Sequence, residues 1–347
     1  MLINFEKEKL TIGQLLSRNI NDFITDDEKK IVKVITAWEG KTLSFPLTTS
    51  GSTGNPASIE LTREQLAYSA RTSLSYLDPD AKFESTLLCI NPHFIGGMMV
   101  IIRALIRSLD LTFIPASSGL KNLPANQTYD LTSLVPIQLQ ELLDHHPHKL
   151  QQFRTILIGG APLPKHYRDR LQEFSHLRVY QTYGMTETAS HVALKSLSAS
   201  EDHYHTLGDL QISTDDRNCL QIRGTITNNQ WIQTNDVVRL VSPSAFEWLG
   251  RADFAINSGG IKIHSEKLEE QLSDQIKLPY FVAGMPDERL GERVELFVES
   301  SEPLTIGFEH IDKYHQPKKI HFLRKFVYTE SGKINRKKTL ALISHER

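Results

Sequence analysis

A run of hydroxyl residues and glycines near the start of the chain has the composition of a loop that binds phosphate. It reads Thr49, Ser50, Gly51, Ser52, Thr53, Gly54, Asn55 and Pro56. Glycine lets backbone N–H groups approach an anion closely, and the serine and threonine hydroxyls add further donors. The run is not a Walker A motif, because Pro56 and Ala57 stand where that motif has its second glycine and its lysine. An ordinary surface loop of the same composition remains the alternative.

Two consecutive glycines follow Thr155–Ile158, an apolar run with the pattern of a buried strand. Glycines at the carboxyl end of a strand allow a flat ligand to lie against the backbone. We therefore expect a nucleotide to contact the residues after Gly159, although a plain strand end is the alternative. These residues are Gly160, Ala161 and Pro162.

The segment 181–188 places an aromatic ring, a glycine, a hydroxyl and a carboxylate within five residues. In turn, these groups suit stacking on a base, a turn, contact with a phosphate and coordination of Mg²⁺. We predict that Thr186 and Glu187 act at the reacting phosphate, with Glu187 as the metal ligand. The whole predicted contact set is Thr182, Tyr183, Gly184, Thr186 and Glu187.

Two single residues complete this set. Asp236 could accept from both hydroxyls of a ribose, since one carboxylate has two acceptor oxygens. Lys333 follows a glycine that leaves its loop open, and its charge could offset that of a phosphoryl transition state. A turn aspartate and a solvated lysine are the plainer alternatives, but the number and order of the segments favour the functional interpretation.

Charge and cysteine content limit the partners. The chain has 347 residues, 39 basic and 41 acidic side chains, and a net charge of −2, which gives no reason to expect nucleic acid. Cys89 and Cys219 are the two cysteines of the sequence, and they fit a reducing compartment rather than a disulfide framework. The longest apolar stretch, 94–106, contains Arg103 and is too short to span a bilayer. We expect a cytoplasmic protein with small-molecule partners, and a homodimer stays open.

Strand and helix patterns alternate over most of the chain, which predicts α/β organisation. The spacing of Thr62–Gln65 is that of a capping box, and a helix should follow it. Past residue 250 the pattern predicts a smaller α+β domain, so we place the domains at 1–251 and 252–347. The expected strands are 86–90, 111–114, 155–158, 177–180, 293–299 and 318–328, and the expected helices are 97–109, 164–174 and 265–272.

Taken in order, these segments resemble the adenylate-forming superfamily, which contains acyl-CoA synthetases, peptide-synthetase adenylation domains and luciferases. The resemblance runs from about residue 47 to 336. It implies a large N-terminal domain for ATP and acyl binding and a small, mobile C-terminal domain. It also implies contacts of Arg251 with ribose and phosphate, a hinge at Asp253, and entry of Gly259 and Gly260 into the site for thioester formation. Lys333 matches the adenylation lysine.

The reaction implied by this resemblance has two steps in one site. The substrate carboxylate attacks the α-phosphorus of ATP, while Mg²⁺, the phosphate loop and Lys333 offset the charge of the leaving pyrophosphate. The C-terminal domain then turns about Asp253, and the thiol of coenzyme A attacks the acyl adenylate. The implied ligands are therefore a small carboxylic acid, ATP, Mg²⁺ and coenzyme A.

Within the superfamily, the segments 133–139 and 183–190 most resemble the 2-succinylbenzoate–CoA ligases of menaquinone biosynthesis. Such a dicarboxylate needs its second carboxylate held by hydrogen-bond donors. His93 matches the position of a gate beside the acyl pocket. The complete set of substrate candidates is His93, Gly184, Ser190, His191 and Lys195.

Departures from the family pattern keep alternatives open. Ala57 replaces the usual loop lysine, Asn235 replaces the glycine before the ribose aspartate, and Ser265 stands where proline is common. Only 48 residues precede the loop, which implies a trimmed N-terminal subdomain. Another aryl- or fatty-acid–CoA ligase, a carrier-protein-loading enzyme and a non-catalytic nucleotide-binding relative remain alternatives. The basic groups at 318–319 and 336–338 are expected on a solvated face, with contact to the phosphates of coenzyme A as the alternative.

Overall fold

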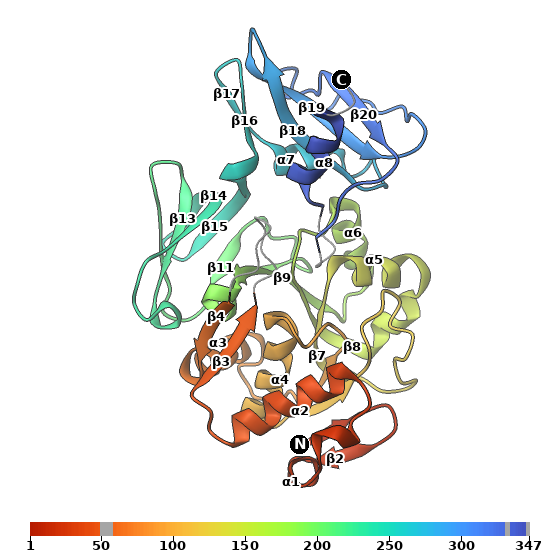
Figure 1. The fold of residues 1–347 in the computed structure, drawn as a ribbon, viewed down its shortest axis with the longest axis vertical. Helices are drawn as coiled ribbons and strands as arrows, with labels where there is room; N and C mark the ends of the chain where they lie inside the picture. The colour runs from red at the N-terminus through yellow and green to blue at the C-terminus, as the bar shows by residue number, and fades with distance from the viewer. Residues whose placement is uncertain (49–57, 330–333, 345–347) are drawn as a thin grey trace.

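The computed structural model describes residues 1–48, 58–329 and 334–344 (Figure 1). Its largest sheet has a parallel part, whose strands are rich in buried aliphatic residues on both faces, as is typical when helices cover a sheet. These strands are β1 (Leu2–Asn4), β5 (Ser85–Leu88), β6 (Asp110–Phe113), β7 (Tyr129–Leu134), β8 (Phe153–Ile158) and β9 (Arg178–Met185).

The rest of this sheet is antiparallel. It consists of β2 (Lys9–Thr11), β10 (Ser190–Ser196), β11 (Tyr204–Thr206), β12 (Gln211–Thr214), β13 (Cys219–Arg223), β14 (Ile232–Ser242) and β15 (Ala245–Arg251). The thirteen strands run in the order β12-β13-β14-β15-β11-β10-β9-β8-β7-β5-β6-β1-β2. Strand β9 pairs in parallel with β8 and antiparallel with β10, so the pairing changes at the strand that carries the start of the predicted nucleotide segment 181–188.

Helices cover the large sheet. They are α1 (Ile12–Leu16), α2 (Asp26–Glu39), α3 (Arg63–Leu77), α4 (Ile95–Arg107), α5 (Pro136–His145) and α6 (Lys165–Arg170). Helix α3 begins with the predicted capping box, in which Gln65 N–H donates to the Thr62 hydroxyl and the Gln65 side chain accepts from Thr62 N–H.

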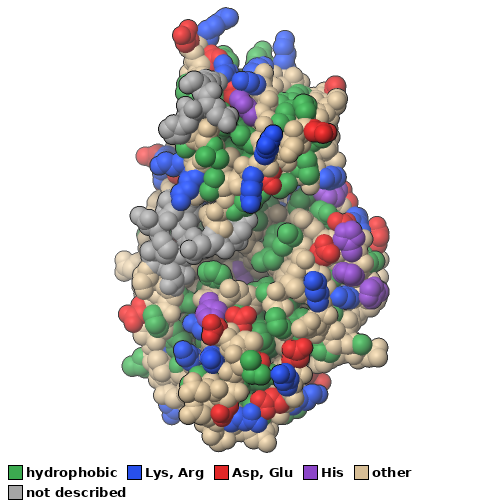
Figure 2. Space-filling model, turned by 45° about the vertical axis from the view of Figure 1, so that its right-hand side comes forward, with side chains coloured by type: hydrophobic (Ala, Val, Ile, Leu, Met, Phe, Trp, Pro, Cys, Tyr) green, Lys and Arg blue, Asp and Glu red, His purple; other side chains and the backbone are tan. Residues whose placement is uncertain are grey.

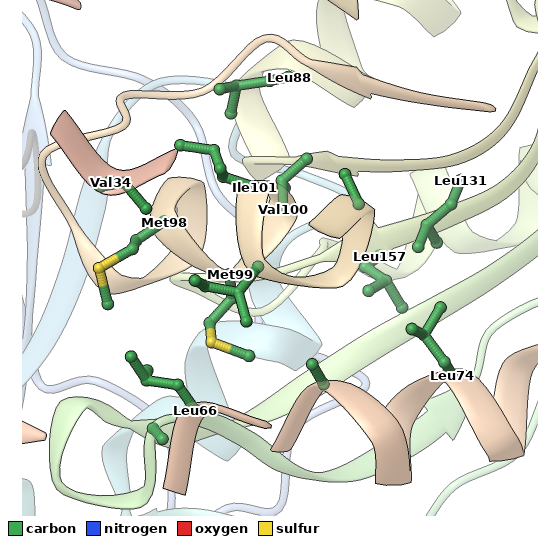
Figure 3. Close-up of a cluster of buried hydrophobic side chains, with 14 of the residues drawn as sticks. Val34, Leu66, Leu74, Leu88, Met98, Met99, Val100, Ile101, Leu131 and Leu157 are labelled. Carbon is green, nitrogen blue, oxygen red and sulfur yellow. The ribbon is translucent and has the colours of Figure 1, made fainter. Parts of the chain in front are cut away.

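Helix α4 is apolar on nearly every face, which is the pattern of a buried helix. Its methionines and aliphatic residues pack between α2, α3 and the parallel strands, and burial of each side chain contributes about 1.5–3 kcal/mol. Figure 3 shows ten labelled members of this cluster: Val34, Leu66, Leu74, Leu88, Met98, Met99, Val100, Ile101, Leu131 and Leu157.

A second sheet begins after residue 254. Its strands are β16 (Ala255–Ser258), β17 (Ile261–His264), β18 (Tyr280–Asp287), β19 (Gly291–Glu299) and β20 (Lys319–Leu323), and it packs with α7 (Ser265–Leu272) and α8 (Arg336–Ser344). The two hydrophobic clusters here contain only residues from 256 onward, whereas the two clusters of the large sheet end at residue 248. We therefore propose that the boundary between the two domains lies after residue 251.

The short elements complete the description. Strands β3 (Ser44–Thr48) and β4 (Ser58–Thr62) form an antiparallel pair. Short 3₁₀ helices lie at Ile20–Asp22, Pro147–Gln152, Leu171–Glu173, Thr186–Thr188, Thr225–Thr227 and Ala252–Phe254. No described helix has both the length and the apolar run that a membrane span requires. Figure 2 shows basic and acidic side chains interspersed over the face in view.

Three sequence expectations need correction. The helix expected over 164–174 is α-helical only over 165–170 and continues as a 3₁₀ turn, and the strand expected over 318–328 spans only 319–323. Arg336 does not lie on a solvated face. Its guanidinium pairs with Glu269 at 2.8 Å and lies over the Phe254 ring at 4.3 Å. The sequence predicted a solvated Arg336. In the structure, aromatic rings and the Glu269 carboxylate compensate for the burial of its guanidinium.

Candidate active site

Asp236 lies on β14 with both carboxylate oxygens in contact with donors. The Tyr183 hydroxyl donates to Oδ2 at 2.8 Å, and the Trp248 indole N–H donates to Oδ1 at 3.2 Å. Each carboxylate oxygen has two lone pairs, so both oxygens keep an acceptor position. The carboxylate is thus held in one orientation and can still accept from a diol. This geometry fits the ribose contact, which stays a prediction.

Tyr183 belongs to an aromatic group beside this carboxylate. Its ring lies edge-on to Phe246 at 5.1 Å and tilted to Tyr204 at 5.7 Å. Burial, and next the charge of Asp236, raise the pKa of Tyr183 well above its ordinary value. The phenol therefore remains protonated at neutral pH and acts as a lasting donor to Asp236.

Arg251 lies opposite Asp236 in the register of β14 and β15. Its guanidinium pairs with Asp253 at 2.7 Å and lies 3.9 Å from the Asp236 carboxylate. A guanidinium has five N–H donors, so these two contacts leave donors for a phosphate or ribose oxygen. Asp253, the expected hinge, is the middle residue of the 3₁₀ turn Ala252–Phe254, which directly follows β15. The register of two neighbouring strands therefore brings three of the predicted residues together.

The loop after β8 is fixed by one side chain of β9. The Gln181 amide donates to the Ala161 carbonyl at 2.8 Å, and its oxygen accepts from Leu163 N–H at 3.2 Å. Gly160 has a φ of +94°, which favours glycine, and a Cβ there would meet no described atom within 4 Å. The loop 159–162 thus exposes open backbone surface, as contact with a flat ligand requires.

Gly184 does not form the turn that the sequence predicted. It lies inside β9, opposite His191 of β10. A Cβ at this position would lie 2.1 Å from the Ser190 carbonyl oxygen and 2.5 Å from the His191 Cα. Glycine is needed here because two strands approach closely, which is a second common reason for a glycine in a strand.

Thr186 and Glu187 lie on the 3₁₀ turn that follows β9. The Thr188 hydroxyl, which contacts the Ser190 carbonyl at 2.9 Å, closes this turn, and Ala189 has a φ of +47°. The Glu187 side chain is exposed. A single exposed carboxylate fits Mg²⁺, which is commonly held by one or two carboxylates together with substrate phosphates.

Two predicted segments, 49–57 and 330–333, fall outside the described residues, so Thr49–Gly54 and Lys333 are not located. Their described neighbours are placed. Strands β3 and β4 pair Thr48 with Ser58, and β4 contacts the turn that carries Glu187.

Gly259 and Gly260 form the two-residue turn between β16 and β17. Their φ values are +59° and +83°, and this pair of positive angles is what a tight hairpin turn demands. In Figure 1 the β16–β17 hairpin lies in the upper part of the view, remote from β9.

The structure does not bring all substrate candidates together. Gly184, Ser190 and His191 are neighbours across β9 and β10. By contrast, the Lys195 ammonium lies over the Tyr204 ring at 5.0 Å, and the exposed His93 imidazole lies 3.4 Å from the Asp27 carboxylate.

His191 lies beside a buried arginine, Arg103, which was not among the site residues predicted from the sequence. Arg103 of α4 is only 2% exposed and donates to Ser73 Oγ at 3.0 Å and to His191 Nδ1 at 3.3 Å. Nδ1 therefore acts as the acceptor, and Nε2 carries the proton. Nε2 is buried and has no hydrogen-bond partner among the described residues. Burial, and next the charge of Arg103, lower the pKa of His191 well below its ordinary value.

His191 is one of the residues that line a small cavity bordered by α3 and β10. Its volume is about 10 Å³, which is roughly the room that one water molecule needs. Its lining includes Tyr68, Ser69, Thr72 and Leu207. A buried donor beside a cavity is a position where an acceptor group can bind.

Sequence reasoning missed Arg103 and Trp248 as members of the site. The signal for Arg103 was present, because a charge inside the apolar stretch 94–106 must find polar partners when the helix is buried. No comparable signal marks Trp248, whose indole reaches Asp236 only through the register of β14 and β15.

Comparison with known proteins places the chain in a described family. A family model for AMP-binding enzymes matches residues 7–213, more than half of the chain. The probable 2-succinylbenzoate–CoA ligase of Mycobacterium tuberculosis is 26% identical over 325 residues, which cover 85% of the chain and 83% of that protein. The 2-succinylbenzoate–CoA ligase of Bacillus anthracis is 26% identical over 363 residues, with 91% and 73% coverage.

Two solved structures resemble the fold. An acyl-CoA synthetase (AMP-forming)/AMP-acid ligase II-like protein from Dyadobacter fermentans is 31% identical with a TM-score of 0.65, covering 96% of the chain and 99% of that protein. The O-succinylbenzoate coenzyme A synthetase (MenE) of Bacillus subtilis, solved with ATP and magnesium ion, is 22% identical with a TM-score of 0.75, covering 85% and 69%. The predicted α/β fold of adenylate-forming enzymes is thereby confirmed.

Proposed function

The chain belongs to the AMP-binding enzyme family, and we propose that it joins a carboxylic acid to coenzyme A through an acyl adenylate, with release of AMP and pyrophosphate. The observation that carries this proposal is the Asp236 carboxylate, which Tyr183 and Trp248 orient beside the Arg251 guanidinium. A fixed diol acceptor beside a cation suits a ribose and its phosphate.

Adenylate formation requires that negative charge be offset while pyrophosphate leaves. We assign this role to the loop 49–54 and Lys333 together with Arg251. Glu187 would hold Mg²⁺, which when bound draws charge from the phosphate oxygens. The open backbone of Gly160, Ala161 and Pro162 and the ring of Tyr183 would receive the adenine, and Thr182 and Gly184 complete that wall.

Thioester formation requires a second arrangement of the chain. We propose that residues 252–347 turn about Asp253, so that the Gly259–Gly260 turn replaces Lys333 at the site and admits the thiol of coenzyme A. Because both half-reactions use the same site in turn, the acyl adenylate is kept away from water between them.

For the acid itself we propose 2-succinylbenzoate, with its distant carboxylate near His191. Both curated relatives are named for this substrate, and the Nε2–H of His191, backed by Arg103, supplies a buried donor of the kind that a second carboxylate needs. A bound carboxylate would widen the cavity it enters. We place the reaction in the cytoplasm, since Cys89 and Cys219 are free and buried, as suits a reducing compartment.

A Lys333→Ala variant tests the assigned division of labour. It should lose pyrophosphate release from Mg-ATP and the acid by about 100-fold or more, the scale seen when one transition-state donor is removed. It should still convert a supplied acyl adenylate to the thioester, because that step does not use the lysine. Pyrophosphate release at the rate of the unchanged protein would refute the assignment.

A further inference from the structure

Helix α7 of the second sheet is joined to the large sheet by ion pairs. The Glu270 carboxylate contacts the Arg168 guanidinium of α6. Lys267 lies one turn away and pairs with Glu247 of β15 at 3.0 Å and with Glu270 at 3.5 Å. These four side chains, Arg168, Glu247, Lys267 and Glu270, are called the α6–α7 ion pairs below.

The α6–α7 ion pairs are only partly solvated. The side chain of Arg168 is 18% exposed, that of Glu247 17%, and that of Glu270 35%. Burial alone would raise the pKa of Glu270, but Arg168 and then Lys267 lower it below its ordinary value. Reduced contact with water makes such a pair more sensitive to the loss of one partner than an exposed pair.

Two of these ion pairs join residues that lie on opposite sides of the expected hinge at Asp253. Arg168 and Glu247 precede Asp253 in the chain, whereas Lys267 and Glu270 follow it. A rotation about Asp253 that moves α7 away from α6 and β15 would separate Arg168 from Glu270 and Lys267 from Glu247, because each of these two pairs has one member on either side of Asp253. The pairs therefore favour a single orientation of α7 against α6 and β15.

That orientation is the one in which the Gly259–Gly260 turn lies remote from β9 (Figure 1). If this turn must reach the site for thioester formation, the orientation described here belongs to the other half-reaction. We propose that Arg168 and Glu270 are positioning residues for adenylate formation, holding the C-terminal part of the chain in the orientation of that step. This inference rests on the proposed function.

Charge reversal tests the proposal on the full-length chain. The variants are Arg168→Glu, Glu270→Arg and the swapped double variant, which restores opposite charges at the same two positions. Lys165→Glu serves as the matched control, because Lys165 is exposed and pairs with Asp169 within α6 at 2.8 Å. For each variant, adenylate formation is measured as ATP–pyrophosphate exchange, and thioester formation is measured from supplied acyl adenylate and coenzyme A.

We expect each single reversal to slow adenylate formation about tenfold, as typical coupling energies of contacting charges imply. Thioester formation should stay within about twofold of the unchanged protein or rise, and the swapped variant should regain most of the lost exchange rate. A merely structural role would impair both half-reactions together, since both use the second sheet. Equal losses in both steps, no recovery in the swapped variant, or an equal loss in the control would overturn the proposal.

Hydrogen exchange of the backbone at 252–254 separates this inference from the proposed function. If Arg168 and Glu270 restrain rotation, each single reversal should speed exchange there, and the swap should reverse the change, whether or not the acid is turned over. Absence of both half-reactions in the unchanged protein would refute the proposed function, while unchanged exchange in the single variants would refute the restraint.

Discussion

At the scale of single residues, Asp236 should act through its charge as well as its shape. An Asp236→Asn variant keeps the size of the side chain but replaces one acceptor oxygen with a donor. Because hydrogen bonds to charged groups contribute about 1.5–3 kcal/mol, the KM for ATP in pyrophosphate exchange should rise roughly 10- to 100-fold. A matched Asp215→Asn variant, in a surface turn where Asp215 pairs with Arg217, should leave this KM unchanged. An unaltered KM in Asp236→Asn would contradict the ribose contact.

Lys195 should contribute to stability in a way that changes with pH. Burial, and next the charge of Arg168, lower its pKa to about 8. The unfolded chain therefore binds more protons than the folded chain between pH 8 and the ordinary lysine pKa of about 10.4, and stability rises with pH across that window.

A Lys195→Met variant should accordingly melt at a higher temperature than the unchanged protein at pH 7, with a difference that shrinks between pH 8 and about pH 10.4. Thermal unfolding at several pH values measures this, and Lys319→Met on the exposed side of β20 controls for the substitution itself. A difference in melting temperature that does not vary with pH would show that the amine is not desolvated.

Residue types alone were sufficient to select Asp236, Tyr183 and Glu187 as candidates, because few side chains can accept a diol, stack on a base or bind Mg²⁺. Residue types were not sufficient to decide which of His191 and Lys195 is the better candidate for contact with the substrate. That distinction depends on which neighbours each side chain meets across β10, and a one-residue irregularity in the pairing of β10 with β9 alters the alternation of faces.

At the scale of elements, the contact between β9 and β10 depends on Gly184. A Gly184→Ala variant would place a methyl group 2.1 Å from a backbone oxygen of β10, so the strands must separate and the segment 186–191 must shift. We expect destabilisation of a few kcal/mol and loss of adenylate formation.

Gly96→Ala is the matched control for this substitution. A Cβ at Gly96 in α4 would meet Ile90 Cδ1 at 3.5 Å, an ordinary contact, and alanine favours helix over glycine by about 1 kcal/mol. Denaturant unfolding should find Gly96→Ala at least as stable as the unchanged protein. Equal stability of the two alanine variants would show that the strands do not need glycine at 184.

Elements with strong local signals were predictable. The capping box of α3, the strand over 155–158 and the helix over 265–272 agree with the structure, because capping and periodicity are local properties. The end of α6 and the length of β20 were not predictable, since the ends of elements depend on tertiary packing. The burial of Arg336 was not predictable either, because its aromatic and acidic partners are more than fifty residues away in the chain.

At the scale of the whole molecule, the order of the motifs was more informative than any single motif. It predicted the α/β fold of the large sheet and the presence of a smaller α+β region after residue 250. The packing of α7 against α6 could not be predicted, because charged residues such as Arg168 and Glu270 look like ordinary surface residues in the sequence. Only the three-dimensional arrangement pairs them across the expected hinge.

Turnover of defined acids decides whether the protein is a 2-succinylbenzoate–CoA ligase. Pyrophosphate release from Mg-ATP should be measured with 2-succinylbenzoate, benzoate and a medium-chain fatty acid in parallel, with coenzyme A present and product masses recorded. We expect release confined to 2-succinylbenzoate, with a product of the mass of its coenzyme A thioester. Release with benzoate or the fatty acid alone would contradict the proposed substrate, and no release with any of the three acids would contradict the assignment as this ligase.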